Sequence, residues 1–97
     1  MVERKVVVKN KSGLHARPAA LFVQIANKYD SDINIKKGSQ KVNGKSIMGI
    51  MMLAAERGSR VVIMANGPDA KDAANELEKL LLSNTLDDWY EKEKKKI

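Results

Sequence analysis

His15 is the only histidine of the 97-residue chain, and it stands in the segment GLHARP. A predicted helix begins at the next residue, where backbone N–H groups have no partner within the helix and the helix dipole is positive. A phosphoryl group there would be met by the N–H groups of Ala16 and Arg17, and the Arg17 guanidinium would add charge-assisted hydrogen bonds. Gly13 permits a sharp turn before the helix, and Pro18, which lacks an N–H, is tolerated in its first turn.

The chemistry that suits these residue types is phosphoryl transfer. A neutral imidazole, with an ordinary pKa of about 6.5, is a nucleophile at neutral pH without a general base. Transfer needs mainly positioning and charge stabilisation, and no pair of carboxylates that could bind Mg²⁺ lies nearby in the sequence. The segment predicts a residue that accepts and passes on a phosphoryl group, not one that activates ATP. A lone histidine at this place can also be only a helix cap or a surface residue.

Ser46 precedes a short apolar stretch, IMGIMML. Serine is a favoured N-cap, so capping of a short helix is its simplest role. A phosphate on Ser46 would be tolerated at a helix start and would add about −1.5 to −2 charges beside a basic surface, repelling an acidic partner. Ile47, Met48, Met51 and Met52 cannot all face inward, so we expect an exposed apolar patch that suits docking to several partners.

The composition and the charge of the chain exclude several classes of protein. The chain has 43% apolar and 31% charged residues, which indicates one globular domain. It has no cysteine and a single histidine, so we expect no disulfide, no metal site and no cofactor. Residues 1–60 carry twelve Lys or Arg against four Asp or Glu, which indicates acidic or anionic partners. The charged start and the lack of a long apolar stretch predict a cytoplasmic protein without membrane insertion.

The elements that must position these residues follow from the hydrophobic patterns. Strands are predicted over residues 2–8, 33–35, 41–43 and 60–65, and helices over 16–28, 47–55 and 70–82. The order β-α-β-β-α-β-α predicts an α+β open-faced sandwich, in which three helices cover one face of a four-stranded antiparallel sheet. We expect residues 1–85 to form the domain, followed by a charged C-terminal extension, residues 86–97.

The segment LHARPA resembles the active-site signature of HPr, the histidine-containing phosphocarrier of the bacterial sugar phosphotransferase system. The resemblance implies that His15 accepts a phosphoryl group on Nδ1 from phosphorylated enzyme I and passes it to sugar-specific IIA domains. Arg17 would be its supporting charge, and Ser12 falls where the family has a residue of the site loop. A protein of this kind is a carrier and not an enzyme, and we expect it to be a monomer.

The block around Ser46 resembles the regulatory-serine site of HPr proteins from Gram-positive-type bacteria. The resemblance implies that HPr kinase/phosphorylase phosphorylates Ser46, and that the product is a poor acceptor from enzyme I and a corepressor of the catabolite-control transcription factor. It also assigns Ile47, Met48 and Met51 to the docking surface. Gly44 departs from the bulkier residue that many members have at that position. The two motifs, at the family's separation, extend the resemblance over about residues 1–85.

Two other functions stay open. A regulatory adaptor would act through Ser46 while His15 is idle, but adaptors of this kind in the family replace the histidine, and here it stands beside Arg17. A small nucleic-acid-binding domain would fit the basic charge, but the few aromatic residues are scattered and give no stacking platform. The sequence therefore favours a sugar-transport phosphocarrier, regulated at Ser46, without direct nucleic-acid contact.

Overall fold

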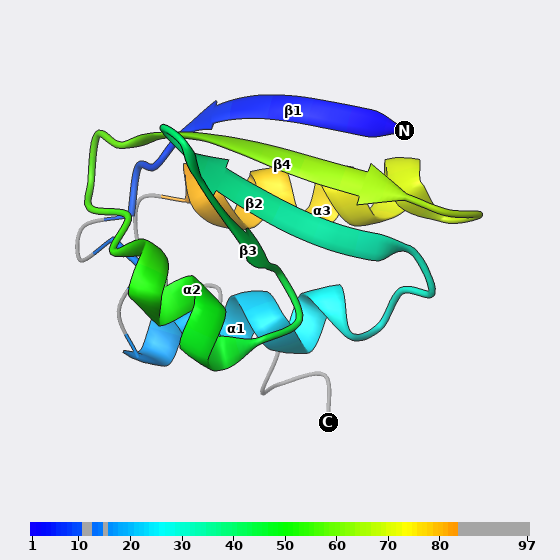
Figure 1. Cartoon of the computed structure of the whole chain (residues 1–97), viewed down its shortest axis with the longest axis horizontal. Helices are drawn as coiled ribbons and strands as arrows, with labels where there is room; N and C mark the ends of the chain where they lie inside the picture. The colour runs from blue at the N-terminus through cyan, green and yellow to red at the C-terminus, as the bar shows by residue number, and fades with distance from the viewer. Residues whose placement is uncertain (11–12, 15, 84–97) are drawn as a thin grey trace.

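The computed structural model describes residues 1–10, 13, 14 and 16–83, with the backbone alone for residues 16 and 17. Its elements are β1 (Val2–Val7), α1 (Ala16–Ala26), β2 (Asp32–Lys37), β3 (Gln40–Asn43), α2 (Ile47–Leu53), β4 (Arg60–Asn66) and α3 (Ala70–Leu82) (Figure 1). This order confirms the predicted β-α-β-β-α-β-α pattern. The expected extension, residues 86–97, lies outside the described residues, so the domain boundary stays a prediction.

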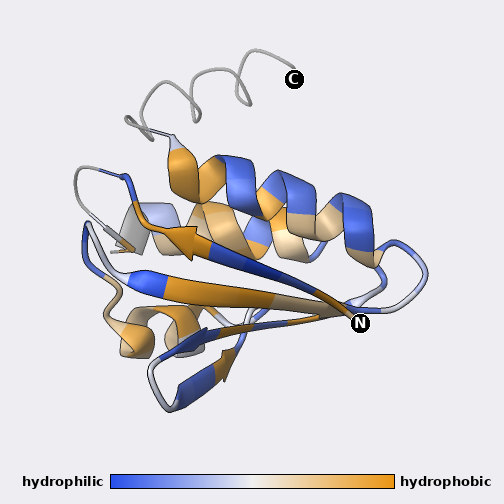
Figure 2. Cartoon of the chain, turned by 90° about the horizontal axis from the view of Figure 1, so that it is seen from above, coloured by the Kyte–Doolittle hydropathy of each residue, from blue (hydrophilic) through white to orange (hydrophobic). Residues whose placement is uncertain are grey.

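The described strands form one antiparallel sheet in the order β1-β4-β2-β3. Successive side chains of a strand point to opposite faces, and along β4 the residues Val61, Ile63 and Ala65 are buried while Val62 and Met64 are partly exposed. Figures 1 and 2 show α1 and α3 behind the sheet and α2 beside β3, with the other face left uncovered. The predicted open-faced sandwich is confirmed.

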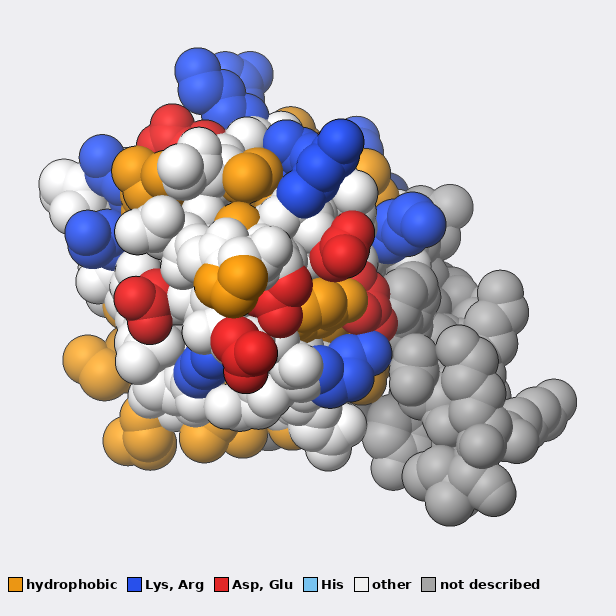
Figure 3. All heavy atoms as spheres, turned by 90° about the vertical axis from the view of Figure 1, so that its right-hand side faces the viewer, with side chains coloured by type: hydrophobic (Ala, Val, Ile, Leu, Met, Phe, Trp, Pro, Cys, Tyr) orange, Lys and Arg blue, Asp and Glu red, His pale blue; other side chains and the backbone are white. Residues whose placement is uncertain are grey.

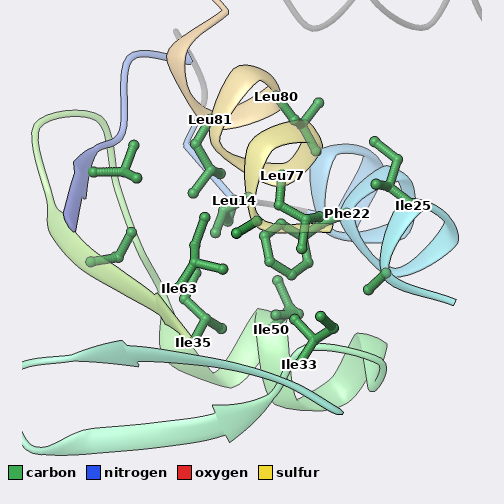
Figure 4. Packing of buried hydrophobic residues seen from close by; sticks show 14 of the residues in the cluster. Leu14, Phe22, Ile25, Ile33, Ile35, Ile50, Ile63, Leu77, Leu80 and Leu81 are labelled. Atoms are coloured by element: carbon green, nitrogen blue, oxygen red, sulfur yellow. The ribbon is translucent and has the colours of Figure 1, made fainter. Parts of the chain in front are cut away.

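The hydrophobic core fills the space between the sheet and the helices. Phe22 of α1 and Leu77 of α3 meet Ile63 of the sheet in its centre, and all three are fully buried (Figure 4). Leu14 is part of the same cluster and only 3% exposed. Because burial of a leucine contributes about 1.5–3 kcal/mol, the core anchors the chain one residue before the position of His15.

Two helices end two residues before the predicted ends. α1 stops at Ala26 because the N–H groups of Lys28 and Tyr29 bond to carbonyls three residues back and tighten the chain into a turn. α2 stops at Leu53 because Ala54 adopts a left-handed φ of 51° and donates its N–H to the Met51 carbonyl. Hydrophobic periodicity continues past both ends, so it could not predict these backbone turns.

Polar contacts join the loop after α1 to α3. The Asp69 carboxylate accepts hydrogen bonds from Ser31 Oγ at 2.5 Å and from the N–H groups of Ser31 and Asp30 at 3.0 and 2.9 Å. These bonds, that of the Ser31 hydroxyl above all, lower the pKa of Asp69 below its ordinary 3.8. Nearby, the Tyr29 hydroxyl donates to Glu76, and burial together with this bond raises the pKa of Tyr29 to about 12. The loop is thereby fixed at both ends.

We expect Asp69→Asn to destabilise the protein at neutral pH, because the amide is uncharged and its Nδ2 cannot accept a hydrogen bond, so at least one of the three donors loses its acceptor. A carboxylate whose pKa is lowered by folding contributes stability that is present above its ordinary pKa of 3.8 and lost as the pH falls through the folded pKa. Urea unfolding at a series of pH values should show the advantage of the wild type shrinking below pH 3.8. Asp72→Asn removes an exposed carboxylate of the same helix and is the control; equal losses in both variants would contradict the prediction.

Candidate functional site

The structure describes the segments that flank the residues on which the predicted chemistry depends. His15 and Ser12 lie outside the described residues, as does the side chain of Arg17. The backbone helix of α1 begins at Ala16, so position 15 directly precedes a helix start, as predicted. Pro18 is buried in the first turn, which contains no acidic residue. No carboxylate of that turn therefore opposes an anion at the helix start.

Gly13 brings the chain against the loop that follows α2. It has a φ of +67°, and a Cβ at this position would lie 2.7 Å from the Ala55 carbonyl oxygen and 2.9 Å from Glu56 Cα. The next N–H, that of Leu14, donates to the same Ala55 oxygen at 2.8 Å. Only glycine fits both the backbone conformation and the close approach. The start of α1 is thereby fixed relative to α2.

Asn10 fixes the other end of the segment that leads to α1. It is fully buried, and its Nδ2 donates to the carbonyls of Leu80 at 3.1 Å and Ser83 at 2.7 Å. Its own carbonyl accepts the N–H of Gly13 at 3.2 Å. Nothing in the local sequence pattern signals that Asn10 binds the end of α3. The structure assigns it a positioning role that sequence reasoning missed.

Ser46 is the N-cap of α2, as predicted. It has extended backbone angles, φ −111° and ψ 116°, and its Oγ accepts the N–H of Gly49 at 3.1 Å. Gly44, two residues earlier, lies against β2: a Cβ there would come within 2.6 Å of Ile33 Cγ2. The departure of Gly44 from the bulkier residue of many family members therefore has a packing reason in this chain.

The outer side of α2 is an apolar patch. Ile47, Met48, Met51 and Met52 are 42%, 68%, 44% and 67% exposed, while Ile50 and Leu53 on the opposite side of the helix are buried. We call these four exposed residues the α2 patch; hydrophobic side chains line the lower edge of the view in Figure 3, the side on which α2 lies in Figure 1. The expected exposure of at least two of them is confirmed. Met52 joins the three residues that the family resemblance assigns to docking.

The α2 patch and the start of α1 lie at the same end of the molecule. Figures 1 and 2 place α2 next to the first turns of α1, and the two helices pack against each other. The hydrogen bond from Leu14 to Ala55 links the segments that flank them. A protein docked on the α2 patch would therefore reach the position directly before α1.

The described part of the chain contains no group of three or more His, Cys, Asp or Glu side chains that could hold a metal ion. Within the same residues, no helix combines the length and the apolar character that crossing a membrane requires.

Comparisons with known proteins identify relatives over most of the chain. A family model described as the PTS HPr component phosphorylation site matches residues 2–83. The HPr-like protein Crh of Bacillus subtilis is 54% identical over 77 residues, 79% of this chain and 91% of Crh. The phosphocarrier protein HPr of Treponema pallidum is 46% identical over 80 residues, 82% of this chain and 91% of that protein. The crystal structure of HPr from Bacillus anthracis has a TM-score of 0.81 at 50% identity, covering 82% of this chain and 95% of that one.

One solved relative bears on the oligomeric state. The crystal structure of Bacillus subtilis Crh, which is described as a domain-swapped, intertwined dimer, has a TM-score of 0.70 at 47% identity. It covers 88% of this chain and 98% of the Crh chain. This dimer counts against the monomer expected from the sequence.

The family match runs from β1 to just past the end of α3 and includes every described helix and strand. The family includes the phosphocarriers of the phosphotransferase system, which are not enzymes. The fold, the relatives and the family match agree, and the chain belongs to the HPr family.

Proposed function

We propose that this protein is a cytoplasmic phosphocarrier of the sugar phosphotransferase system. His15 accepts a phosphoryl group on Nδ1 from phosphorylated enzyme I and passes it to sugar-specific IIA domains. The observation that carries the proposal is a histidine directly before a helix whose start is fixed by Gly13 and Leu14, in a chain of the HPr family. The helix start and Arg17 supply what a phosphoryl group needs there.

The transfer is an exchange of one bond for another. The lone pair on His15 Nδ1 attacks phosphorus, so an N–P bond forms while the bond between phosphorus and enzyme I breaks. The N–H groups at the start of α1 and the Arg17 guanidinium stabilise the charge on the phosphoryl oxygens. The same exchange onto a IIA domain restores the neutral imidazole. Neither step requires a cofactor, because the phosphoryl group is already activated on its donor.

The α2 patch is the proposed docking surface for these partners. Its exposed methionines adapt to differently shaped surfaces, which suits one carrier that serves several proteins. Its place beside the start of α1 brings a docked partner to His15. We assign the same surface to enzyme I, IIA domains, HPr kinase/phosphorylase and the catabolite-control transcription factor, the last through phosphorylated Ser46.

The experiment that tests the carrier function uses the wild-type protein with enzyme I and radiolabelled phosphoenolpyruvate. We expect an acid-labile label on the protein, as a phosphohistidine gives, and its loss when an unlabelled IIA domain is added. A label that resists acid, or no label from active enzyme I, would overturn the proposal. A label that no IIA domain removes would overturn the relay.

The identity to Crh supports a second candidate, a regulatory adaptor that acts only through Ser46. Such a protein would take label from ATP in the presence of HPr kinase/phosphorylase and none from enzyme I. The two assays, run side by side on the wild-type protein, separate the candidates. We favour the carrier because His15 and Arg17 are both present.

We expect Ser46→Asp to lower kcat/KM for phosphoryl acceptance from enzyme I by about tenfold or more, because a negative charge at the edge of the α2 patch repels an acidic partner. Ser39→Asp is the matched control: it adds the same charge on an exposed residue of the turn between β2 and β3. The rates of the Ser39 variant should stay close to those of the wild type. An equal decrease in both variants would show that only the net charge matters and would contradict a regulatory role of this position.

A further inference from the structure

The face of the sheet away from the helices carries a row of lysines. Lys5 of β1 and Lys36 of β2 both lie opposite Val62 of β4, and Lys41 of β3 lies opposite Lys36. All three lysines are exposed, whereas Ile35, the neighbour of Lys36 that points to the other face, is fully buried. Lys5, Lys36 and Lys41 thus form one line across the whole sheet, the lysine row.

The charge of the lysine row is not compensated. Lys36 and Lys41 face each other directly on neighbouring strands, an arrangement in which like charges destabilise a sheet. Within the described residues, neither the lysine row nor the adjacent exposed Arg60 forms an ion pair or a side-chain hydrogen bond. Arg4, which points to the covered face, is paired with Glu78. The lysine row lowers the stability of the sheet and has no anionic partner among the described residues. It therefore indicates an anionic partner outside this chain.

The carboxylates that the described strands place on the uncovered face lie toward one end of the sheet. On the uncovered face, Glu3 and Asp32 stand at the ends of β1 and β2 that are remote from Arg60. Figure 3 shows acidic side chains gathered on one side of the molecule. Asp72 lies in the first turn of α3 and the N–H of Asp30 bonds to Asp69 directly before it, so both lie where α3 begins. The half of the sheet face around the lysine row is therefore positive, and this half would meet an anionic surface first.

The shape of this face selects among anionic partners. The side chain between Lys5 and Lys36 is that of Val62, so the described part of this row offers no aromatic platform on which single-stranded nucleic acid could stack. Among the described elements, no helix projects from this face to enter the groove of a duplex. A broad row of lysines with aliphatic stems fits a broad anionic surface. We propose that the lysine row docks on an anionic phospholipid bilayer.

Docking in this way leaves the functional end of the molecule free. α1 lies behind the sheet and α2 beside β3, so the start of α1 and the α2 patch stay open to partners while the lysine row contacts lipid (Figures 1 and 2). Each lysine at an anionic membrane surface strengthens binding about fivefold, and salt screens the attraction. The contact is therefore weak, reversible and peripheral, without insertion into the bilayer.

Sedimentation with vesicles of phosphatidylcholine, with or without phosphatidylglycerol, tests the proposal. The full-length wild type should sediment only with vesicles that contain phosphatidylglycerol, and less so as salt is added. Lys36→Gln/Lys41→Gln should weaken this binding by about tenfold or more. Lys71→Gln/Lys79→Gln removes two exposed lysines from α3, on the covered side, and changes the net charge equally; it should bind nearly as the wild type does.

Three results would overturn the proposal. The first is that the wild type does not bind phosphatidylglycerol vesicles at low salt, and the second is that the two double variants lose vesicle binding equally. The third is that the Lys36/Lys41 variant loses affinity for duplex DNA in a parallel titration but keeps its affinity for the vesicles. The last result would assign the face to nucleic acid. The Lys36/Lys41 variant should be at least as stable to urea as the wild type, because it removes a repulsion. The assay contains neither enzyme I nor a phosphoryl donor, so its outcome is independent of the carrier function.

Discussion

Replacing His15 with alanine should reduce the label from phosphorylated enzyme I to background while leaving ATP-dependent labelling by HPr kinase/phosphorylase unchanged. The chain contains no second histidine and no cysteine, so no other side chain offers an imidazole or thiolate to the phosphoryl group. Positioning by the start of α1 and by Arg17 cannot replace the missing nucleophile. The loss should therefore be complete, whatever the concentration of enzyme I.

Ser46→Ala is the reciprocal variant. It should keep the acid-labile label from enzyme I and lose the acid-stable label from the kinase, at a cost of about 1 kcal/mol in stability from the lost N-cap bond to Gly49. Urea unfolding of both variants shows whether each is folded under the assay conditions. A folded His15→Ala protein that still takes label from enzyme I, or a Ser46→Ala protein that still takes label from the kinase, would place the acceptor elsewhere.

Most of the fold was predictable because its elements carry local periods. In β4, Val61, Ile63 and Ala65 alternate with more exposed residues, and in α3 a stripe of alanines and leucines returns every three or four residues. Periods of this kind depend only on residue type and spacing. The two helix ends were not predictable in the same way, because the i−3 hydrogen bonds after Ala26 and the left-handed φ of Ala54 leave no mark in the hydrophobic pattern.

In the candidate site, too, the features that follow from local sequence were predictable and those that depend on the tertiary fold were not. The motif around His15 and the serine before α2 are local patterns, and both could be read from the chain. The contacts of Asn10 with Leu80 and Ser83 span 70 and 73 residues of sequence, and those of Asp69 with the loop before β2 also depend on the tertiary fold. Side chains that hold a site from a distance leave no spacing pattern, so only the structure assigns them.

Among the residues that position the start of α1, Gly13 should be the most sensitive to substitution. Gly13→Ala should lower the free energy of unfolding by about 2–5 kcal/mol, since a left-handed backbone costs alanine about 1–2 kcal/mol and overpacking costs about 1–3 kcal/mol. The added methyl group would meet the Ala55 carbonyl oxygen at 2.7 Å and Glu56 Cα at 2.9 Å, both of them backbone atoms that cannot rotate away. Urea unfolding measures the loss.

Gly38→Ala separates the clash from the backbone strain. Gly38 has nearly the same φ, +60°, but nothing lies within 4 Å of an added Cβ, so this variant should lose only about 1–2 kcal/mol. The relief of the clash at Gly13 would shift the chain two residues before His15, and a misplacement of about 1 Å costs a reaction about a hundredfold in rate. Gly13→Ala should therefore also slow phosphoryl acceptance under conditions where it is folded, while Gly38→Ala should not. Equal losses of stability in the two variants, with unchanged acceptance rates, would mean that the loop after α2 yields freely and does not position the start of α1.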